Sequence, residues 1–168
     1  MNHISIENKY ECTGCRACYH VCPKSCISMI KDSEGFQYPK VDLDDCINCG
    51  KCISTCPVIQ KKEAIIKSKK PIAVYACYNN NDKILKESSS GGVFTALAER
   101  IIQNGGVVFG AMYQDNFYVA HGFVEKVEDL CKLRGSKYVQ SDISESYREV
   151  KQFLEENKPV LFSGAPCG

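Results

Sequence analysis

The pattern of hydrophobic and polar positions changes near residue 70 of the 168-residue chain. Before that point, two short apolar runs at residues 27–30 and 36–41 flank a polar segment containing Gly35, which predicts two short strands joined by a turn. After it, buried-type apolar runs alternate with amphipathic ones, as strands and helices do in α/β layered domains. The chain is therefore expected to contain two regions of different fold class.

The second region is predicted to begin at residue 72. We expect strands over residues 72–78, 107–112, 118–124 and 159–162, and helices over residues 93–102, 126–133 and 144–156. The first long helix should bury Val93, Phe94, Leu97, Ala98, Ile101 and Ile102, and the last should bury Tyr147, Val150, Phe153 and Leu154. Because the last predicted strand leads into a loop of the kind that binds ligands and precedes a further helix, we expect the natural domain to continue beyond Gly168.

Composition places the chain among soluble globular proteins, with 44% hydrophobic and 24% charged residues. The formal net charge of +1 provides no basic field for nucleic acid. The polar N-terminus is not a secretory signal, and the longest apolar run, residues 107–113, is too short to span a bilayer. We expect a cytoplasmic protein that binds neither nucleic acid nor a membrane.

The 12 cysteines change this ordinary picture, because most of them lie between Cys12 and Cys56. Such density is typical of a disulfide scaffold in a secreted chain or of thiolate metal ligation in a reducing compartment. The lack of an export signal favours ligation, and the spacing supports it. Two runs have the same pattern of three close cysteines followed by a Cys-Pro pair, at residues 12–23 and 46–57.

This pattern is the bacterial ferredoxin run for [4Fe–4S] clusters, in which the fourth cysteine ligates the other cluster. One cluster is thus expected to take Cys12, Cys15, Cys18 and Cys56, and the other Cys46, Cys49, Cys52 and Cys22. Small residues such as Gly14, Ala17 and Gly50 help the chain wrap a compact cube. Loop amides can then point at the sulfurs and set the reduction potential.

Zinc is the alternative metal, but zinc sites use separated cysteine pairs and do not need a third close cysteine and a Cys-Pro pair. Iron–sulfur chemistry would also imply an oxygen-poor cytoplasm. Cys26 and His20 fall outside the ligand pattern. Cys26 is interpreted as a small buried apolar residue, and His20 as a surface or packing residue.

Two segments of the second region are candidates for binding an anion. Residues 88–92, Ser-Ser-Ser-Gly-Gly, precede a helix and could cradle phosphate with free amides, or could be a serine cap with a flexible turn. Residues 134–138, Arg-Gly-Ser-Lys-Tyr, could hold a phosphate or a flavin edge, or could be a basic turn. Between the two regions, lysine-rich residues 61–71 are predicted to be a linker, either a solvated connector or a contact for an acidic partner.

Four motifs occur together in one order: the ferredoxin runs, residues 87–97 (ESSSGGVFTAL), residues 133–141 (LRGSKYVQS) and residues 162–167 (FSGAPC). In this the chain resembles the coenzyme F420 hydrogenase/dehydrogenase beta-subunit family. The resemblance implies a flavoprotein, usually with FAD, connected to iron–sulfur clusters. It implies flavin contacts at Ser90, Gly91, Gly92, Gly135, Ser136, Lys137, Tyr138, Gly164, Ala165, Pro166 and Cys167. Ala165 stands where the family more often has threonine, and the family's C-terminal half lies beyond Gly168.

The sequence thus predicts an α+β ferredoxin-like 2[4Fe–4S] module at residues 1–60 and a partial α/β domain at residues 72–168. The main hypothesis is an oxidoreductase subunit that passes electrons between a flavin, or coenzyme F420 as hydride partner, and the two clusters, with Lys137 stabilising a reduced flavin. Its partners would be a redox protein or subunit and a small hydride carrier. The alternative is an electron-relay module without substrate chemistry, and a third hypothesis is a nonfunctional truncation whose open sheet edge invites aggregation.

Overall fold

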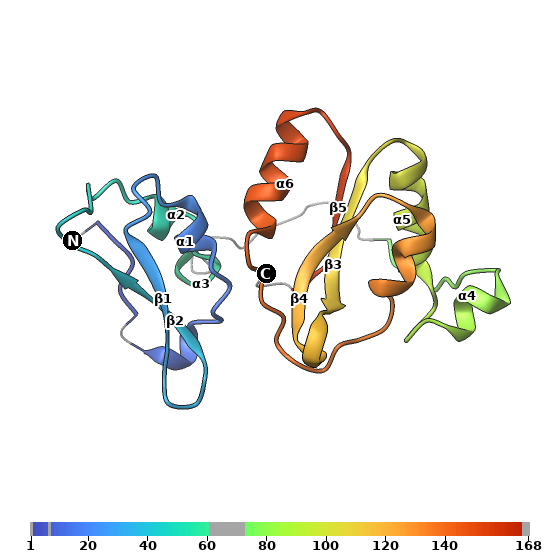
Figure 1. Cartoon of the computed structure of the whole chain (residues 1–168), viewed down its shortest axis with the longest axis horizontal. Coiled ribbons are helices and arrows are strands. Elements are labelled where there is room, and N and C mark those ends of the chain that lie inside the picture. Colours follow the sequence, from blue (N-terminus) through green and yellow to red (C-terminus); the bar gives the residue numbers. More distant parts are fainter. Residues whose placement is uncertain (1, 7, 61–72, 166–168) are drawn as a thin grey trace. The chain divides into compact units, whose positions relative to one another are not determined.

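The structure, a computed structural model, describes residues 2–6, 8–60 and 73–165. The chain forms two compact units, one within residues 1–70 and the other within residues 71–164. We call them unit 1 and unit 2; both can be followed by colour in Figure 1. The predicted linker, residues 61–71, lies outside the described residues.

Unit 1 consists of short elements around a two-stranded sheet. In chain order they are η1 (Lys9–Glu11), α1 (Ala17–Val21), β1 (Ile27–Lys31), β2 (Gln37–Val41), α2 (Lys51–Ser54) and α3 (Pro57–Gln60). Strands β1 and β2 pair antiparallel, with Ile27 opposite Val41 and Lys31 opposite Gln37. The Asp32 carboxylate accepts hydrogen bonds from the backbone N–H groups of Glu34 and Phe36, and Gly35 has φ +91°. The predicted hairpin is confirmed, because its turn has both an Asx-type bond and a glycine in the left-handed region.

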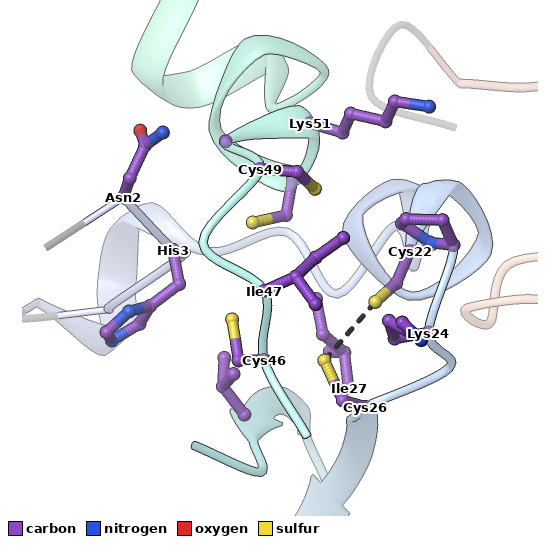
Figure 2. A pocket seen from close by; sticks show the side chains of 14 residues that line it. Asn2, His3, Cys22, Lys24, Cys26, Ile27, Cys46, Ile47, Cys49 and Lys51 are labelled. Atoms are coloured by element: carbon purple, nitrogen blue, oxygen red, sulfur yellow. Dashed lines mark hydrogen bonds between the residues drawn. The ribbon is translucent and has the colours of Figure 1, made fainter. Parts of the chain in front are cut away.

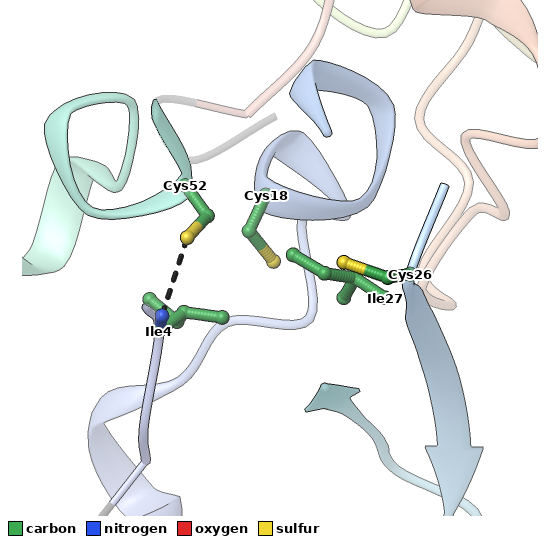
Figure 3. Close-up of a cluster of buried hydrophobic side chains, with 5 residues drawn as sticks. All are labelled: Ile4, Cys18, Cys26, Ile27 and Cys52. Carbon is green, nitrogen blue, oxygen red and sulfur yellow. Dashed lines mark hydrogen bonds between the residues drawn. The ribbon is translucent and has the colours of Figure 1, made fainter. Parts of the chain in front are cut away.

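Three of the five buried side chains in the core of unit 1 are cysteines. The five are Ile4, Ile27, Cys18, Cys26 and Cys52. Figure 3 shows Cys18 from α1 and Cys52 from α2 reaching toward Ile4 and Ile27. The prediction that Cys26 is buried is confirmed, since its exposed fraction is 7%.

Unit 2 is built on a small mixed sheet. Its elements are α4 (Asp82–Lys86), α5 (Val93–Gln103), β3 (Val107–Tyr113), η2 (Asp115–Phe117), β4 (Val119–Val124), η3 (Val127–Lys132), α6 (Ser146–Glu155) and β5 (Val160–Phe162). The strand order is β4-β3-β5. Strand β3 pairs antiparallel with β4, with Val108 opposite Val124, and parallel with β5, with Val107 opposite Val160. The predicted mixture of helices and strands is confirmed, in the form of a three-stranded mixed sheet.

The two faces of this sheet are covered by different helices. Val108 packs in one cluster with Ala98 of α5 and Leu130 of η3. The next residue along β3, Phe109, points to the opposite face and contacts the rings of Phe123, Phe153 of α6 and Phe162. Figure 1 shows α5 and α6 on opposite sides of the sheet.

Several sequence predictions for unit 2 are wrong in detail. Residues 73–78 form no strand, and the side chains of Val74 and Tyr75 are more than four-fifths exposed, because no neighbouring strand pairs with them. Leu97 and Leu154 were expected in the core but are more than half exposed. Helix α4 was not predicted; it begins after Asn81, whose side chain accepts hydrogen bonds from the N–H groups of Lys83 and Ile84.

The short helix expected over residues 126–133 is a 3₁₀ helix. Among the described helices, none combines the length and the apolar character that a bilayer crossing requires.

Candidate metal centre

The structure brings the two cysteine runs together around two cavities. The first, of about 330 Å³, is lined by Cys12, Cys15, Cys18 and Cys56 among other residues. Cys12 follows η1, Cys18 lies in α1, and Cys56 directly precedes α3. The fourth cysteine therefore comes from the second run, as the crossed arrangement requires.

The second cavity has the complementary set. Cys46, Cys49 and Cys52 of the second run line it together with Cys22 of the first, and Figure 2 shows the sulfurs of Cys22, Cys46 and Cys49 around it. This cavity is narrower, with a volume of about 20 Å³. Among the described residues, no three His, Cys, Asp or Glu side chains converge on one point that could hold a single ion. The thiols instead stand around cavities.

Backbone conformation explains why the two runs follow the same path. Two residues after the first cysteine, Gly14 and Asn48 have φ of +67° and +52°. Two residues further on, Arg16 and Gly50 have φ of +61° and +72°, immediately before α1 and α2. Each loop thus bends twice through the left-handed region, where glycine and asparagine are the least strained residues. Sequence reasoning identified the two glycines but missed Asn48, whose residue type is a weak signal for this conformation, and Arg16, whose residue type is none.

The electrostatics of the first cavity indicate a site suited to a cation. Burial, together with the neighbouring thiols of Cys15, Cys12 and Cys56, raises the pKa of Cys18 to about 12. Burial also raises the pKa of Cys12, opposed by a hydrogen bond from the Gly14 backbone. Thiols this close cannot all ionise by themselves, whereas bound iron would deprotonate each of its ligands. The donor set therefore fits a thiolate-ligated iron–sulfur cluster.

Cys22 differs from Cys12 and Cys18 because hydrogen bonds favour its ionised form. Burial raises the pKa of the Cys22 thiol, but hydrogen bonds from the backbone and thiol of Cys26 and from the backbone of Lys24 and Ser25 outweigh it. The pKa of Cys22 consequently lies below its ordinary value. Hydrogen bonds aimed at a charged sulfur stabilise it, so this turn is preorganised for an ionised ligand.

The N-terminal segment covers the second cavity. The backbone N–H of Ile4 donates to Cys52 Sγ at 3.2 Å, the bond drawn in Figure 3. Asn2 donates from its side chain to the Asn48 carbonyl at 2.9 Å and lies 2.8 Å from the position a Cβ would take at Gly50. Sequence reasoning missed both contacts; the Ile4 contact left no signal in residue type, because its donor is the backbone.

In unit 2, the structure joins two of the predicted flavin-contacting segments. Arg134 Nη1 contacts Glu87 Oε2 at 2.6 Å, and its Nε donates to Thr95 Oγ1 at 3.1 Å. The backbone N–H of Ser136, which follows Gly135, donates to Ser89 Oγ at 2.7 Å. Segments 87–92 and 134–138 are therefore neighbours at the N-terminal end of α5.

The individual residues of these segments lie in different surroundings. Gly91 packs so closely on the Cys77 carbonyl that a Cβ there would stand 2.8 Å from its oxygen, and Gly92 (φ +70°) directly precedes α5. Tyr138 is almost fully exposed, and Ser90 is exposed. Lys137 Nζ donates to the carbonyls of Lys132 and Arg134, and burial lowers its pKa.

His121 connects two further segments of unit 2. Its Nε2 faces the Ser163 carbonyl at 3.2 Å and its Nδ1 faces Ser141 Oγ at 2.8 Å, while its ring stacks on Phe162. Since a carbonyl can only accept, Nε2 carries the proton and the Ser141 hydroxyl donates to Nδ1. His121 thus ties the end of the 133–141 segment to Ser163, which precedes Gly164 and Ala165. Sequence reasoning missed it, although a lone histidine in an apolar strand was a signal; Pro166 and Cys167 lie outside the described residues.

Comparisons with known proteins agree with this division. Residues 11–59 match the family described as "4Fe-4S dicluster domain". Residues 74–148 match the family described as "Coenzyme F420 hydrogenase/dehydrogenase, beta subunit N-term". The dicluster domain implies two [4Fe–4S] clusters, and the chain is related to an electron-transfer class of proteins.

Individual relatives cover different parts of the chain. An uncharacterized ferredoxin of Methanocaldococcus jannaschii is 37% identical over 39% of this chain and 83% of its own length. The coenzyme F420-dependent sulfite reductase of the same organism is 26% identical over 93% of this chain but only 24% of its own length. An uncharacterized protein of that organism is 24% identical over 93% of this chain and 50% of its own length. The chain thus spans about a quarter to a half of those two longer relatives.

The chain therefore belongs to the proteins that join a 4Fe–4S dicluster ferredoxin domain to the N-terminal domain of coenzyme F420 hydrogenase/dehydrogenase beta subunits. The resemblance seen in the sequence motifs is confirmed.

Proposed function

We propose that this chain is the electron-carrying part of an oxidoreductase, in which two [4Fe–4S] clusters in unit 1 exchange electrons with a hydride-accepting group bound by unit 2. The observation that carries the proposal is the grouping of the cysteines. Cys12, Cys15, Cys18 and Cys56 line one cavity, and Cys46, Cys49, Cys52 and Cys22 line the other. Each set contains three cysteines of one run and the fourth of the other, as in two-cluster ferredoxins.

Bound clusters would supply one-electron storage at closely spaced positions. The chain's own residues would hold and adjust them. The Ile4 N–H directed at Cys52 Sγ would stabilise the more negative reduced state and raise the potential of the second cluster. The hydrogen bonds around Cys22 would act in the same direction on its thiolate.

For unit 2 we propose a flavin, FAD in the first instance, as the hydride-accepting group. The support is the hydrogen bond from the Ser136 N–H to Ser89 Oγ. It brings segments 87–92 and 134–138, with their glycines, together at the N-terminal end of α5. A matched relative is named a coenzyme F420-dependent enzyme, which makes coenzyme F420 the candidate hydride donor. Residues Ser90, Gly91, Gly92, Gly135, Ser136, Lys137, Tyr138, Gly164, Ala165, Pro166 and Cys167 stay the proposed flavin contacts.

The second candidate is an electron relay with no flavin of its own. One observation favours it: the Lys137 ammonium is directed at the backbone carbonyls of Lys132 and Arg134 rather than outward toward a ligand. In a flavoprotein, this lysine would have to leave those carbonyls to stabilise a reduced flavin.

Anaerobic purification and reconstitution of the chain test both candidates. We expect about eight iron atoms per chain, four in each cluster, and a broad brown absorption that dithionite bleaches. Addition of FAD should change the visible spectrum of a form extended beyond Gly168, if unit 2 binds flavin. Two clusters with no flavin response would leave the relay, and zinc in place of iron would overturn both candidates.

A further inference from the structure

The second cavity is lined by five thiols rather than four. Besides Cys22, Cys46, Cys49 and Cys52, its lining includes Cys26, which is 7% exposed. Cys26 Sγ lies 3.4 Å from Cys22 Sγ, the contact drawn as a dashed line in Figure 2. Cys26 also interacts with the Cys46 thiol across the cavity. A cysteine placed only to fill the core would have no need to face two cluster ligands.

The backbone holds this fifth thiol firmly. Ser25 has φ +51°, and its N–H donates to the Cys22 carbonyl at 3.2 Å, which makes a tight turn between the two cysteines. The Cys26 carbonyl accepts from the N–H of Asp42 at 2.8 Å, extending the β1–β2 pairing. Cys22 and Cys26 thus approach the same cavity from the two sides of one short turn.

The first cavity offers an internal contrast. There the fourth ligand is Cys56, and the residue four positions later is Gln60 instead of cysteine. The chain continues as α3 after Cys56, and Gln60 Nε2 donates to the Ile53 carbonyl. Among the described residues around this cavity, the cysteines are Cys12, Cys15, Cys18 and Cys56. The two sites are matched in their ligands and differ in the fifth thiol.

We propose that Cys26 is a reserve ligand of the second cluster, which takes over the iron held by Cys22 when the Cys22 sulfur is lost or blocked. The inference rests on the proposed binding of clusters by unit 1. In the exchange, the iron that Cys22 no longer holds forms an Fe–S bond to Cys26. Cys26 gives up its thiol proton to solvent and supplies one thiolate in place of one thiolate, so neither the charge nor the oxidation state of the cluster changes. A chain with this second thiol would keep its cluster after damage at Cys22, whereas the described residues around the first site include no fifth thiol.

The test is iron counting on the full chain, reconstituted anaerobically, together with electron paramagnetic resonance after dithionite reduction. Wild type and Cys26→Ser should each hold about eight iron atoms per chain. Cys22→Ala should also hold about eight, with an altered signal for one cluster because its ligand has changed. Cys22→Ala/Cys26→Ser should fall toward about four, since a serine hydroxyl occupies the space of the thiol but is a poor iron ligand.

The matched control is Cys56→Ala, which should lose iron as a single substitution because Gln60 supplies no thiol. Equal iron loss in Cys22→Ala and in the double variant would overturn the proposal. If the double variant fails to fold, the electron paramagnetic resonance spectrum of Cys22→Ala decides. A spectrum that differs from that of wild type for one cluster supports Cys26 as the new ligand, and a spectrum identical to that of wild type counts against it. Wild type without iron would instead count against the proposed function.

Discussion

Units 1 and 2 bury side chains of different kinds. Unit 1 surrounds Ile4 and Ile27 with three buried cysteines, two of them proposed cluster ligands. Unit 2 buries Val107, Val108 and Phe109 completely along β3, and Leu130 packs against α5. Small domains with little hydrocarbon to bury need a metal or disulfides to fold, whereas a packed apolar core is sufficient by itself. The difference indicates that the stability of unit 1 depends on its clusters and that of unit 2 does not.

Removal of iron is the strongest way to test this comparison. We expect anaerobic chelation to abolish amide protection in β1 and β2 of unit 1 and to leave β3 of unit 2 protected, because the free energy of metal binding is also folding free energy. Hydrogen exchange followed by mass spectrometry of peptides from each unit measures both. Renewed iron and sulfide should restore protection in unit 1. Persistent protection of β1 and β2 in the iron-free chain would contradict the dependence.

The opposite perturbation acts on unit 2. Leu130→Ala removes a fully buried side chain between α5 and β3 and should destabilise unit 2 by about 2–5 kcal/mol. Urea titration read out by hydrogen exchange of β3 peptides gives the change. Leu97→Ala is the matched control, since Leu97 is a leucine of α5 in the same unit but is more than half exposed, and its loss should cost much less.

Iron content tells whether the perturbation stays within unit 2. Leu130→Ala should keep about eight iron atoms per chain. Iron loss in step with the destabilisation of unit 2 would show that the two cores are not independent.

The elements best predicted from the sequence are those whose stability is local or whose core is continuous. The cysteine spacing predicts two crossed sets of four ligands, and each set lines one cavity, the second together with Cys26; that these cysteines bind clusters stays a prediction. The β1–β2 hairpin, α5 and β3 were also predicted, since Gly35 and the 93–103 and 107–113 patterns are strong local signals.

What the sequence could not provide depends on tertiary partners. Residues 73–78 have the composition of a strand but find no neighbouring strand. The Ile4 N–H to Cys52 bond comes from the backbone, which is the same for every residue type. Cys26 was recognised as buried, but its approach to Cys22 requires the left-handed turn at Ser25, which serine rarely signals.

A finer test within unit 1 separates the effect of the Ile4 backbone N–H from the effect of the Ile4 side chain. Ile4→Pro removes the N–H that faces Cys52 Sγ, and Ile4→Val keeps it while trimming one methylene. We expect Ile4→Pro to make the potential of the second cluster more negative, on the order of tens of millivolts, since 59 mV is a tenfold change for one electron. A titration monitored by electron paramagnetic resonance should find the first cluster little changed. Equal shifts in both variants would assign the effect to packing around Ile4.

The smallest expected effect is the dependence of the stability of unit 2 on pH, which tests the contacts of His121 rather than the apolar core. Burial lowers the pKa of His121 below 6.5, only partly opposed by the Ser163 carbonyl. The unfolded chain therefore binds a proton more readily, so the stability from neutral His121 is fully present above pH 6.5 and decreases as the pH falls toward the lower folded pKa. The nearby Asp142 contacts His121 through the backbone, where its carbonyl accepts from the His121 N–H at 2.8 Å.

Because a single side chain carries the lowered pKa, the change in stability should be small. Hydrogen exchange of β4 in wild type and His121→Gln at pH 7.5 and 5.5 isolates it, since glutamine cannot titrate there. Wild type should lose more protection than the variant on acidification. If both lose the same amount, other groups in unit 2 carry the pH dependence, and the link from Ser141 through His121 to Ser163 is insensitive to protonation.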